Sequence, residues 1–261
     1  MTAAKRTEGQ GEGTLLSHLV ELRTRIMRMV ITVLVLFVCL APFADIIFTT
    51  VADPLMARLP EGTSMIATQV ASPFLTPFKL ALAGAVFLAM PMLLYQAWAF
   101  VAPGLYKQER RLILPLMASS ILLFYGGVAF AYYVVFPLMF SFFAAATPSG
   151  VSMMTDIAAY LDFVLALFFA FGLAFEVPVA TVLAVWAGFT TPEKLSKKRP
   201  FVLLGAFVVG MLLTPPDIIS QTLLAVPVYI LFEAGIIMAR VMVPGHKEVE
   251  AQQKEQEQSG S

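Results

Sequence analysis

The stretch Phe163-Val-Leu-Ala-Leu-Phe-Phe-Ala-Phe-Gly-Leu-Ala-Phe-Glu-Val-Pro-Val179 lies in an apolar run, residues 157–187, that is long enough to cross a bilayer. Glu176 sits deep inside this run. A carboxylate at the bilayer centre costs about 2.5–3.5 kcal/mol on insertion scales, so it is normally protonated, paired, or turned toward protein or water. Pro178 removes a backbone donor and predicts a kink close to the acid. We therefore predict an intramembrane polar site at Glu176. A purely structural hydrogen bond to another helix is the alternative.

The composition excludes a soluble protein. Of 261 residues, 59% are hydrophobic and 13% are charged, whereas soluble domains are about 45–50% apolar. The apolar runs are continuous rather than alternating, which indicates helices and not a transmembrane barrel. Cys39 is the single cysteine, so the sequence predicts no disulfide framework and no cysteine metal cluster. We expect neither a metal nor a cofactor.

Six apolar runs predict an all-α, polytopic membrane protein with six transmembrane helices. They are residues 27–43, 74–101, 112–136, 157–187, 201–213 and 218–238. The fifth run covers only about 20 Å at 1.5 Å per residue, and Pro227 interrupts the sixth. We therefore predict that the last two helices are short and thin the bilayer locally.

The membrane domain is expected to span residues 15–240. An amphipathic helix from Leu15 should lie along the membrane surface and lead into the first span. Residues 1–14 are polar and Gly-rich, and residues 241–261 are rich in Gln and Glu, so both segments are expected to be disordered. A cleavable signal peptide is the alternative interpretation of the N-terminus. The polar segment before the first apolar run is too long for a typical n-region, and further spans follow.

The distribution of Lys and Arg predicts the orientation. The loops 44–73 and 137–156 together contain only Arg58. The opposite side carries Lys5, Arg6, Arg23, Arg25, Arg28, Lys107, Arg110, Arg111, Lys194, Lys197, Lys198, Arg199, Arg240, Lys247 and Lys254. Because Lys and Arg gather on the cytoplasmic side of membrane proteins, both termini are predicted to be cytoplasmic.

The signatures of common enzymes are missing from the chain. It contains no His-Glu-x-x-His, no Gly-x-Ser-x-Gly, no Walker loop and no pair of intramembrane aspartates. We therefore predict that the protein is not an enzyme.

Two acids, Glu21 and Glu109, stand among cations on the predicted cytoplasmic face. A carboxylate in such a setting can receive an incoming guanidinium through paired hydrogen bonds, which Lys cannot imitate. The alternative is local pairing. Glu21 and Arg25 have the i, i+4 spacing of a simple helix pair, and Glu109 can pair with Arg110 or Arg111 in water.

A third candidate site is a membrane-embedded polar set that combines Glu176 with Thr214, Gln221 and Glu233. Thr and Gln on a membrane helix can bond a polar group of a partner helix, each contact contributing about 0.6–2 kcal/mol. Internal packing between the last two helices is the alternative.

Several motifs, in order along the chain, resemble the TatC family of the twin-arginine protein translocase. They are His18-Leu-Val-Glu-Leu-Arg-Thr-Arg25, Ala71-Ser-Pro-Phe-Leu-Thr-Pro-Phe-Lys79, Tyr95-Gln-Ala-Trp-Ala-Phe-Val-Ala-Pro-Gly-Leu-Tyr-Lys-Gln-Glu-Arg-Arg111, Phe171-Gly-Leu-Ala-Phe-Glu-Val-Pro178 and Leu213-Thr-Pro-Pro-Asp-Ile-Ile-Ser-Gln221. The resemblance covers about residues 15–240 and is closest to the proteobacterial form.

The resemblance implies a receptor for signal peptides with an Arg-Arg motif, which helps to export folded proteins across the bacterial cytoplasmic membrane using the protonmotive force. Glu21 and Glu109 would receive the two arginines, and Arg23, Phe100 and Lys107 would line the same site. With this implied role beside the residue chemistry, we favour the receptor interpretation of the two acids over local pairing.

The resemblance also implies a cupped bundle of six helices, with Glu176 facing its hollow side. Pro54 and Met65 would belong to a periplasmic cap. Single-span partners of the TatA and TatB families would dock at Met211, Thr214 and Gln221, and copies of the chain would self-associate in the receptor complex within the lipid bilayer. No nucleic-acid partner is expected.

A proton-coupled secondary transporter of small solutes, using Glu176, is the alternative function. Such folds usually contain internal repeats with broken helices in matching positions. The two halves of this chain show no repeat.

Overall fold

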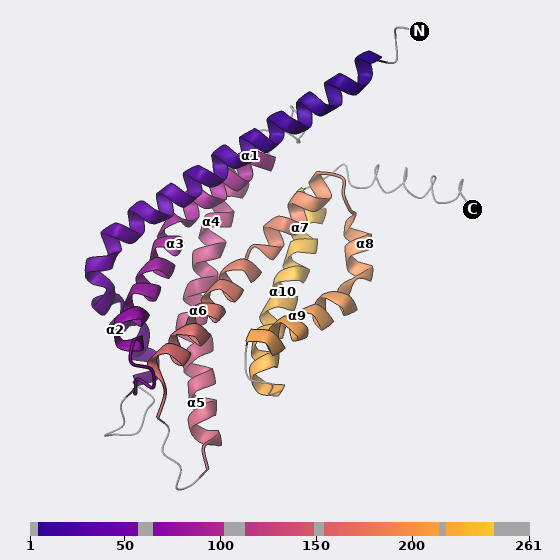
Figure 1. Cartoon of the computed structure of the whole chain (residues 1–261). Helices are drawn as coiled ribbons and strands as arrows, with labels where there is room; N and C mark the ends of the chain where they lie inside the picture. The colour runs from indigo at the N-terminus through magenta and orange to yellow at the C-terminus, as the bar shows by residue number, and fades with distance from the viewer. Residues whose placement is uncertain (1–4, 57–64, 102–112, 149–153, 214–217, 243–261) are drawn as a thin grey trace. The chain divides into compact units, whose positions relative to one another are not determined.

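The computed structural model describes residues 5–56, 65–101, 113–148, 154–213 and 218–242, and nearly all of these residues are helical (Figure 1). Within these ranges the only β-type pairing is an isolated parallel bridge between Ile66 and Asp156. This confirms the predicted all-α fold class. The contacts group the chain into two compact units, one formed by Met1–Ile47 and Pro77–Met117 and the other by Phe48–Thr76 and Ala118–Ser261.

The first helix, α1 (Lys5–Leu40), joins the amphipathic segment and the first span without a break. It begins ten residues before the predicted start at Leu15, inside the segment expected to be disordered. Starting a helix is the costly step, whereas each further residue adds a hydrogen bond. A long apolar helix can therefore extend into the polar residues that precede it.

In the first unit, α1 packs against α3 (Ser72–Val101). A Cβ placed on Gly84 of α3 would lie 3.7 Å from Cδ1 of Leu40, near the end of α1. Near the other end of the pair, Arg25 of α1 donates a hydrogen bond to Gln96 of α3. The two helices therefore run antiparallel.

Residues 44–73, predicted to form a loop, begin with helical turns. A short 3₁₀ turn, η1 (Ala41–Phe43), leads into α2 (Ala44–Met56). Pro54 has no N–H for the Thr50 carbonyl, and the Tyr132 hydroxyl donates to that carbonyl at 2.9 Å. A tyrosine from a later helix thus replaces the backbone donor that proline lacks.

The third span is longer than predicted. The chain continues from α4 (Ile113–Phe130) through a π-helical turn, η4 (Ala131–Val135), into α5 (Phe136–Ala146). Pro137 was expected to end the helix. The π turn shifts the bonding by one residue, so that the Phe136 N–H bonds the Ala131 carbonyl. The helix therefore passes the proline instead of ending there.

The fourth span is broken at the predicted acid. It consists of α6 (Ile157–Ala174) and α7 (Val177–Trp186), with Phe175 and Glu176 between them. Pro178 near the start of α7 has no N–H to continue the α6 ladder, which is the predicted cause of a kink. A short helix, α8 (Pro192–Lys197), follows in the basic loop.

The prediction of two short final helices is correct for α9 (Arg199–Leu213) and wrong for α10 (Ile218–Met242). Helix α9 has 15 residues, whereas α10 has 25 and carries Pro227 in its interior. Lost proline bonds are tolerated in membrane helices because neighbouring helices re-satisfy the freed groups. The prediction that two short helices thin the bilayer locally therefore applies to α9 alone.

Five helical segments of the described part are long and apolar enough to cross a bilayer, and Arg199–Leu212 is a shorter apolar helix. The five are Leu19–Ala52, Ser72–Phe100, Leu114–Ala146, Ile157–Trp186 and Gln221–Met242. These segments correspond to five of the six predicted runs. The count of six spans and the cytoplasmic position of the termini stay predictions.

Candidate functional site

The predicted acid Glu21 lies on α1 and is bound to a guanidinium of its own helix. Arg25 donates to Oε1 of Glu21 from Nε at 3.0 Å and from Nη2 at 2.5 Å. The Glu21 side chain keeps 38% of its surface exposed, against 17% for Arg25. The i, i+4 pair considered from the sequence is therefore formed, and both donors converge on one oxygen.

Arg25 is also bound to α3, independently of Glu21. Its Nη1 donates to Oε1 of Gln96 at 3.1 Å, and its Nη2 donates to the Ala99 carbonyl at 3.1 Å. Gln96 is almost fully buried, at 2% exposure. The planar, five-donor guanidinium is the side chain that can serve three partners at once.

The other residues predicted for this site are only partly described. Arg23 is exposed on α1, and Phe100 is half-buried near the end of α3. Lys107 and Glu109 lie outside the described residues. The structure thus brings Glu21 to the end of α3 that carries Phe100, through Arg25, Gln96 and Ala99.

Glu176 stands at the break between α6 and α7, and within the described part of the chain its side chain is hydrogen-bonded by Ser120 of α4. The Ser120 hydroxyl donates to Oε2 of Glu176. The other oxygen, Oε1, is buried and has no hydrogen-bond partner among the described residues. A buried polar atom without a partner is costly. This carboxyl group therefore offers one open acceptor position to a hydroxyl, an amide or water.

Two glycines let α4 approach α6 closely enough for the Ser120–Glu176 contact. A Cβ on Gly127 would clash with the Phe171 carbonyl oxygen and lie 2.9 Å from its carbon. A Cβ on Gly172 would lie 2.6 Å from Cε2 of Phe124. Small residues at membrane helix contacts allow such close backbone packing.

The predicted membrane-embedded polar set does not gather around Glu176 in the described part of the chain. Glu233 forms a two-pronged ion pair with Arg199, whose Nε and Nη2 donate to the two carboxylate oxygens at 2.5 and 2.7 Å. Gln221 lies against Gly210, where an added Cβ would be 3.6 Å from the Gln221 Cα. Thr214 lies outside the described residues. Glu176 and Glu233 therefore bond different partners, Ser120 and Arg199.

The residues predicted for partner docking and for the cap are found in different surroundings. Met211 keeps 53% of its surface exposed near the end of α9. Pro54 lies in the last turn of α2. Met65 is half-buried and directly precedes Ile66, whose N–H bonds the Thr155 carbonyl at 3.0 Å.

Asp156 fastens together two segments that are distant in sequence, and it was not predicted. Its Oδ2 accepts from the Thr68 N–H at 2.8 Å and from the Thr68 hydroxyl at 2.6 Å. Its Oδ1 accepts from the N–H groups of Ala158 and Ala159, at 2.9 and 3.0 Å, which caps α6. These hydrogen bonds, led by the Thr68 hydroxyl, lower the pKa of Asp156 to about 2.

The sequence pointed to the acids Glu21 and Glu176, but not to the residues on other helices that hold them in place. Ser120 and Gln96 are buried polar residues in apolar helices, and this contrast was the available signal. The sequence placed Asp156 at the end of a loop, where an Asp before a helix is a capping signal. Its tie to Thr68 joins residues 88 positions apart and has no local signature.

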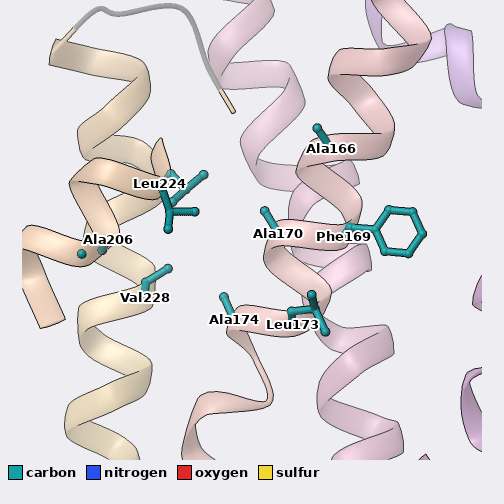
Figure 2. Close-up of a pocket in the computed structure, with 10 residues that line it drawn as sticks. Ala166, Phe169, Ala170, Leu173, Ala174, Ala206, Leu224 and Val228 are labelled. Carbon is teal, nitrogen blue, oxygen red and sulfur yellow. The ribbon is translucent and has the colours of Figure 1, made fainter. Parts of the chain in front are cut away.

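An apolar groove of about 530 Å³ lies among α6, α9 and α10. Figure 2 shows Ala170 and Ala174 of α6 directed toward Leu224 and Val228 of α10. Among the residues that the structure describes, no three His, Cys, Asp or Glu side chains come together as metal ligands.

Long apolar helices and an intramembrane carboxyl group define a multi-pass α-helical membrane protein. The family model for the Sec-independent protein translocase protein TatC matches residues 17–227. The chain belongs to the TatC family.

Similar proteins cover most of the chain. The Sec-independent protein translocase protein TatC of Escherichia coli K12 is 60% identical over 229 residues, covering 88% of this chain and 89% of the relative. The TatC of Aquifex aeolicus is 34% identical over 238 residues, covering 90% and 98%. A solved structure described as the twin-arginine translocase receptor TatC superposes with a TM-score of 0.77 at 35% identity, covering 86% of this chain and 98% of that one.

The family fixes the class of activity. The chain is a multi-pass bacterial membrane protein and a component of the Tat protein translocase, a non-enzymatic family. The predictions of protein transport and of no enzymatic activity are therefore confirmed. The alternative of a small-solute transporter finds no support in the relatives.

Proposed function

We propose that this chain is the receptor for signal peptides with two adjacent arginines, and that it serves export of folded proteins across the cytoplasmic membrane, driven by the protonmotive force. One observation carries the proposal: the partly exposed carboxylate of Glu21 already binds a guanidinium, that of Arg25. Within the described residues, all hydrogen bonds to Glu21 end at Oε1. Oε2 remains as an acceptor for an incoming arginine.

In this proposal Glu21 and Glu109 receive the two arginines, while Arg23, Phe100 and Lys107 line the site. The support is the match of these residues to the family motifs and the description of a related structure as a twin-arginine translocase receptor. Both termini are cytoplasmic and the membrane is the inner membrane, in agreement with the side on which Lys and Arg gather.

Single-span proteins of the TatA and TatB families are the proposed partners, docking at Met211, Thr214 and Gln221. The exposure of Met211 supports this surface. An apolar groove beside Gln221 also supports it, lined by Ile218, Ile219, Thr222, Leu223, Val226 and Pro227. Helix α9, about 22 Å long at 1.5 Å per residue, favours a thinned bilayer there. Copies of the chain associate in the same complex.

The remaining assignments follow the same scheme. Residues 15–240 form the membrane domain in a cupped bundle, with residues 1–14 and 241–261 outside it. Glu176 faces the hollow side of this bundle. Pro54 and Met65 belong to a periplasmic cap, and the tie between Ile66 and the start of α6 supports an ordered outer segment.

The test is binding of a twin-arginine signal peptide to membranes that contain the purified chain. The variants are Glu21→Ala and Glu109→Ala, and the comparison ligand is the same peptide with two lysines. We expect each alanine variant, and the lysine peptide, to weaken binding at least tenfold, as expected for loss of a charge-assisted hydrogen bond. Binding should also weaken with salt, because exposed charges are screened over about 8–10 Å.

Glu193→Ala is the matched control, because Glu193 is an exposed acid in α8 outside the proposed site. It should bind the peptide as the wild type does. Undiminished binding in both site variants would show that Glu21 and Glu109 are ordinary surface charges and would refute the receptor assignment.

A further inference from the structure

We propose that Arg25 is a positioning residue that makes Glu21 select a guanidinium over an ammonium ion. The inference rests on the proposed receptor function of Glu21 and adds a residue that sets its specificity. Arg25 itself does not touch the incoming peptide in this scheme. It acts by fixing and neutralising the carboxylate that does.

The first step is the anchoring of Arg25 to α3. Two of its four hydrogen bonds go to Gln96 and Ala99, and neither involves Glu21. The guanidinium is therefore held even when Glu21 exchanges other partners. Its position is therefore fixed, and it can orient Glu21. Groups behind a binding site orient the residues in contact with the ligand in the same way.

The second step is the gradient of burial from Gln96 to Glu21. Exposure rises from 2% for Gln96 to 17% for the side chain of Arg25 and 38% for that of Glu21. The amide nitrogen of Gln96 donates, among the described residues, only to the sulfur of Met92, at 3.8 Å. Burying an amide whose N–H groups are so weakly bonded costs free energy, so Gln96 is a poor choice for filling space only. Its oxygen is used to hold Arg25.

The third step is the geometry at Glu21. Both donors of Arg25 meet Oε1, and none of the described residues bonds Oε2. The carboxylate is thus oriented, with one oxygen committed to the protein and one offered outward. An incoming guanidinium can place two N–H groups on Oε2, as Arg25 does on Oε1, since a carboxylate accepts about four hydrogen bonds.

The fourth step concerns charge. The Arg25 guanidinium neutralises Glu21, so a bare positive charge gains little from approaching the pair. An ammonium ion binds mainly as a point charge, whereas a guanidinium also gains directional, paired hydrogen bonds. Neutralisation therefore weakens lysine binding more than arginine binding.

The test compares dissociation constants of the twin-arginine and twin-lysine peptides on the full chain in membranes, for the wild type and for Arg25→Gln. We expect the twin-lysine peptide to gain about tenfold on Arg25→Gln, while the twin-arginine peptide changes less. The ratio of the two constants should fall about tenfold, and twin-lysine binding should become steeper in salt. A purely structural role moves neither the ratio nor the salt dependence.

Arg28→Gln is the matched control, since it removes the same charge from an exposed residue one turn further along α1. It should leave the ratio unchanged.

Gln96→Leu tests the anchoring of Arg25 separately, because it keeps the charge of Arg25 and removes one of its hydrogen bonds to α3. It should weaken twin-arginine binding several-fold and leave twin-lysine binding unchanged. Thermal unfolding of each variant reports whether the chain is folded.

The outcomes separate the two proposals. If neither Glu21→Ala nor Glu109→Ala weakens twin-arginine binding, the receptor assignment is wrong and this inference goes with it. If Glu109→Ala alone weakens it, the inference about Arg25 is refuted and the receptor assignment is not. If Glu21→Ala does weaken it but Arg25→Gln shifts both peptides by the same factor, the receptor assignment stands and the positioning role of Arg25 is refuted.

Discussion

Glu21 and Glu176 are the same kind of side chain in two different settings. Glu21 is held by a cation, Arg25, in the unit that contains α1. Glu176 is held by a neutral hydroxyl, Ser120, in the other unit. Glu21 is partly exposed, whereas the buried oxygen Oε1 of Glu176 has no partner among the described residues.

The difference shows how the partner decides what a carboxyl group can do. Beside Arg25, the charge of Glu21 is cancelled, and selectivity must come from hydrogen-bond geometry. Beside Ser120, none of the described residues places an opposite charge at Glu176, and a membrane-embedded acid is costly unless its polar atoms find partners. The first setting suits recognition of a cationic peptide. The second is held together by close helix packing and leaves an acceptor open.

The largest effect is expected from breaking the packing beneath Glu176. In Gly127→Ala, the new Cβ would lie 2.9 Å from the Phe171 carbonyl carbon and closer still to its oxygen. Because backbone atoms cannot yield as a flexible side chain can, α4 and α6 must separate. Overpacking of this kind costs about 1–3 kcal/mol. Unfolding by denaturant in detergent micelles measures the change.

Gly205→Ala is the control for that variant. A Cβ at Gly205 meets nothing within 4 Å, and Ala is the better helix former by up to about 1 kcal/mol. It should be neutral or stabilising. Equal losses at both glycines would mean that backbone propensity, not the contact of α4 with α6, explains the effect.

The next effect tests the hydroxyl partner directly. A double-mutant cycle of Ser120→Ala and Glu176→Leu should give a coupling energy of about 0.6–1.7 kcal/mol, the range measured for hydrogen bonds between membrane helices. Ser141→Ala is the control for loss of a hydroxyl, because Ser141 bonds the Pro137 carbonyl of its own helix. A coupling energy near zero would show that Ser120 does not stabilise Glu176, and the contrast with the Arg25–Glu21 pair would then fail.

A smaller effect is expected at Glu233, a second acid with a cationic partner. Arg199→Lys should lower the unfolding temperature, because Lys cannot reproduce the two parallel bonds of Arg199 to the carboxylate. Solvent weakens the loss, since the side chains are 43% and 25% exposed. Arg240→Lys, which alters a single bond to Ser196, is the control and should shift the temperature less.

The sequence predicted the acids and the helices because both have local signals. Apolar length and the depth of Glu176 are visible in single segments, and the structure breaks the helix at that residue. The i, i+4 spacing likewise indicated the Glu21–Arg25 pair, which was the alternative interpretation of Glu21 and is formed. Signals of this kind need no knowledge of which helices meet.

Partners from other helices were beyond such reasoning. The Ser120–Glu176 contact joins residues 56 positions apart, and Arg25–Gln96 joins residues 71 apart. Helix ends at prolines were also misjudged. Pro137 and Pro227 lie inside helical stretches: a π turn precedes Pro137, and membrane helices in general tolerate the donor that proline lacks.

The smallest effect concerns Asp156, an acid outside the spans that has four neutral donors and no cation in its described surroundings. These donors lower its pKa from 3.8 to about 2, so its charged form is the one that favours the folded state. Its contribution is therefore complete above the unfolded pKa and is lost as the pH falls through the folded one. Asp156→Asn should lower the unfolding temperature by a constant amount above about pH 5, and the difference should vanish toward about pH 2.

Thr68→Val sharpens this comparison, because it removes the strongest donor and keeps the carboxylate. The pKa of Asp156 should move back toward its ordinary range, so the acid-induced loss should be smaller than in the wild type and should be complete at a higher pH. Unfolding temperatures between pH 2 and 7 measure both variants. A pH-independent difference between Asp156 and Asn would mean that the side-chain shape, not its charge, fastens Thr68.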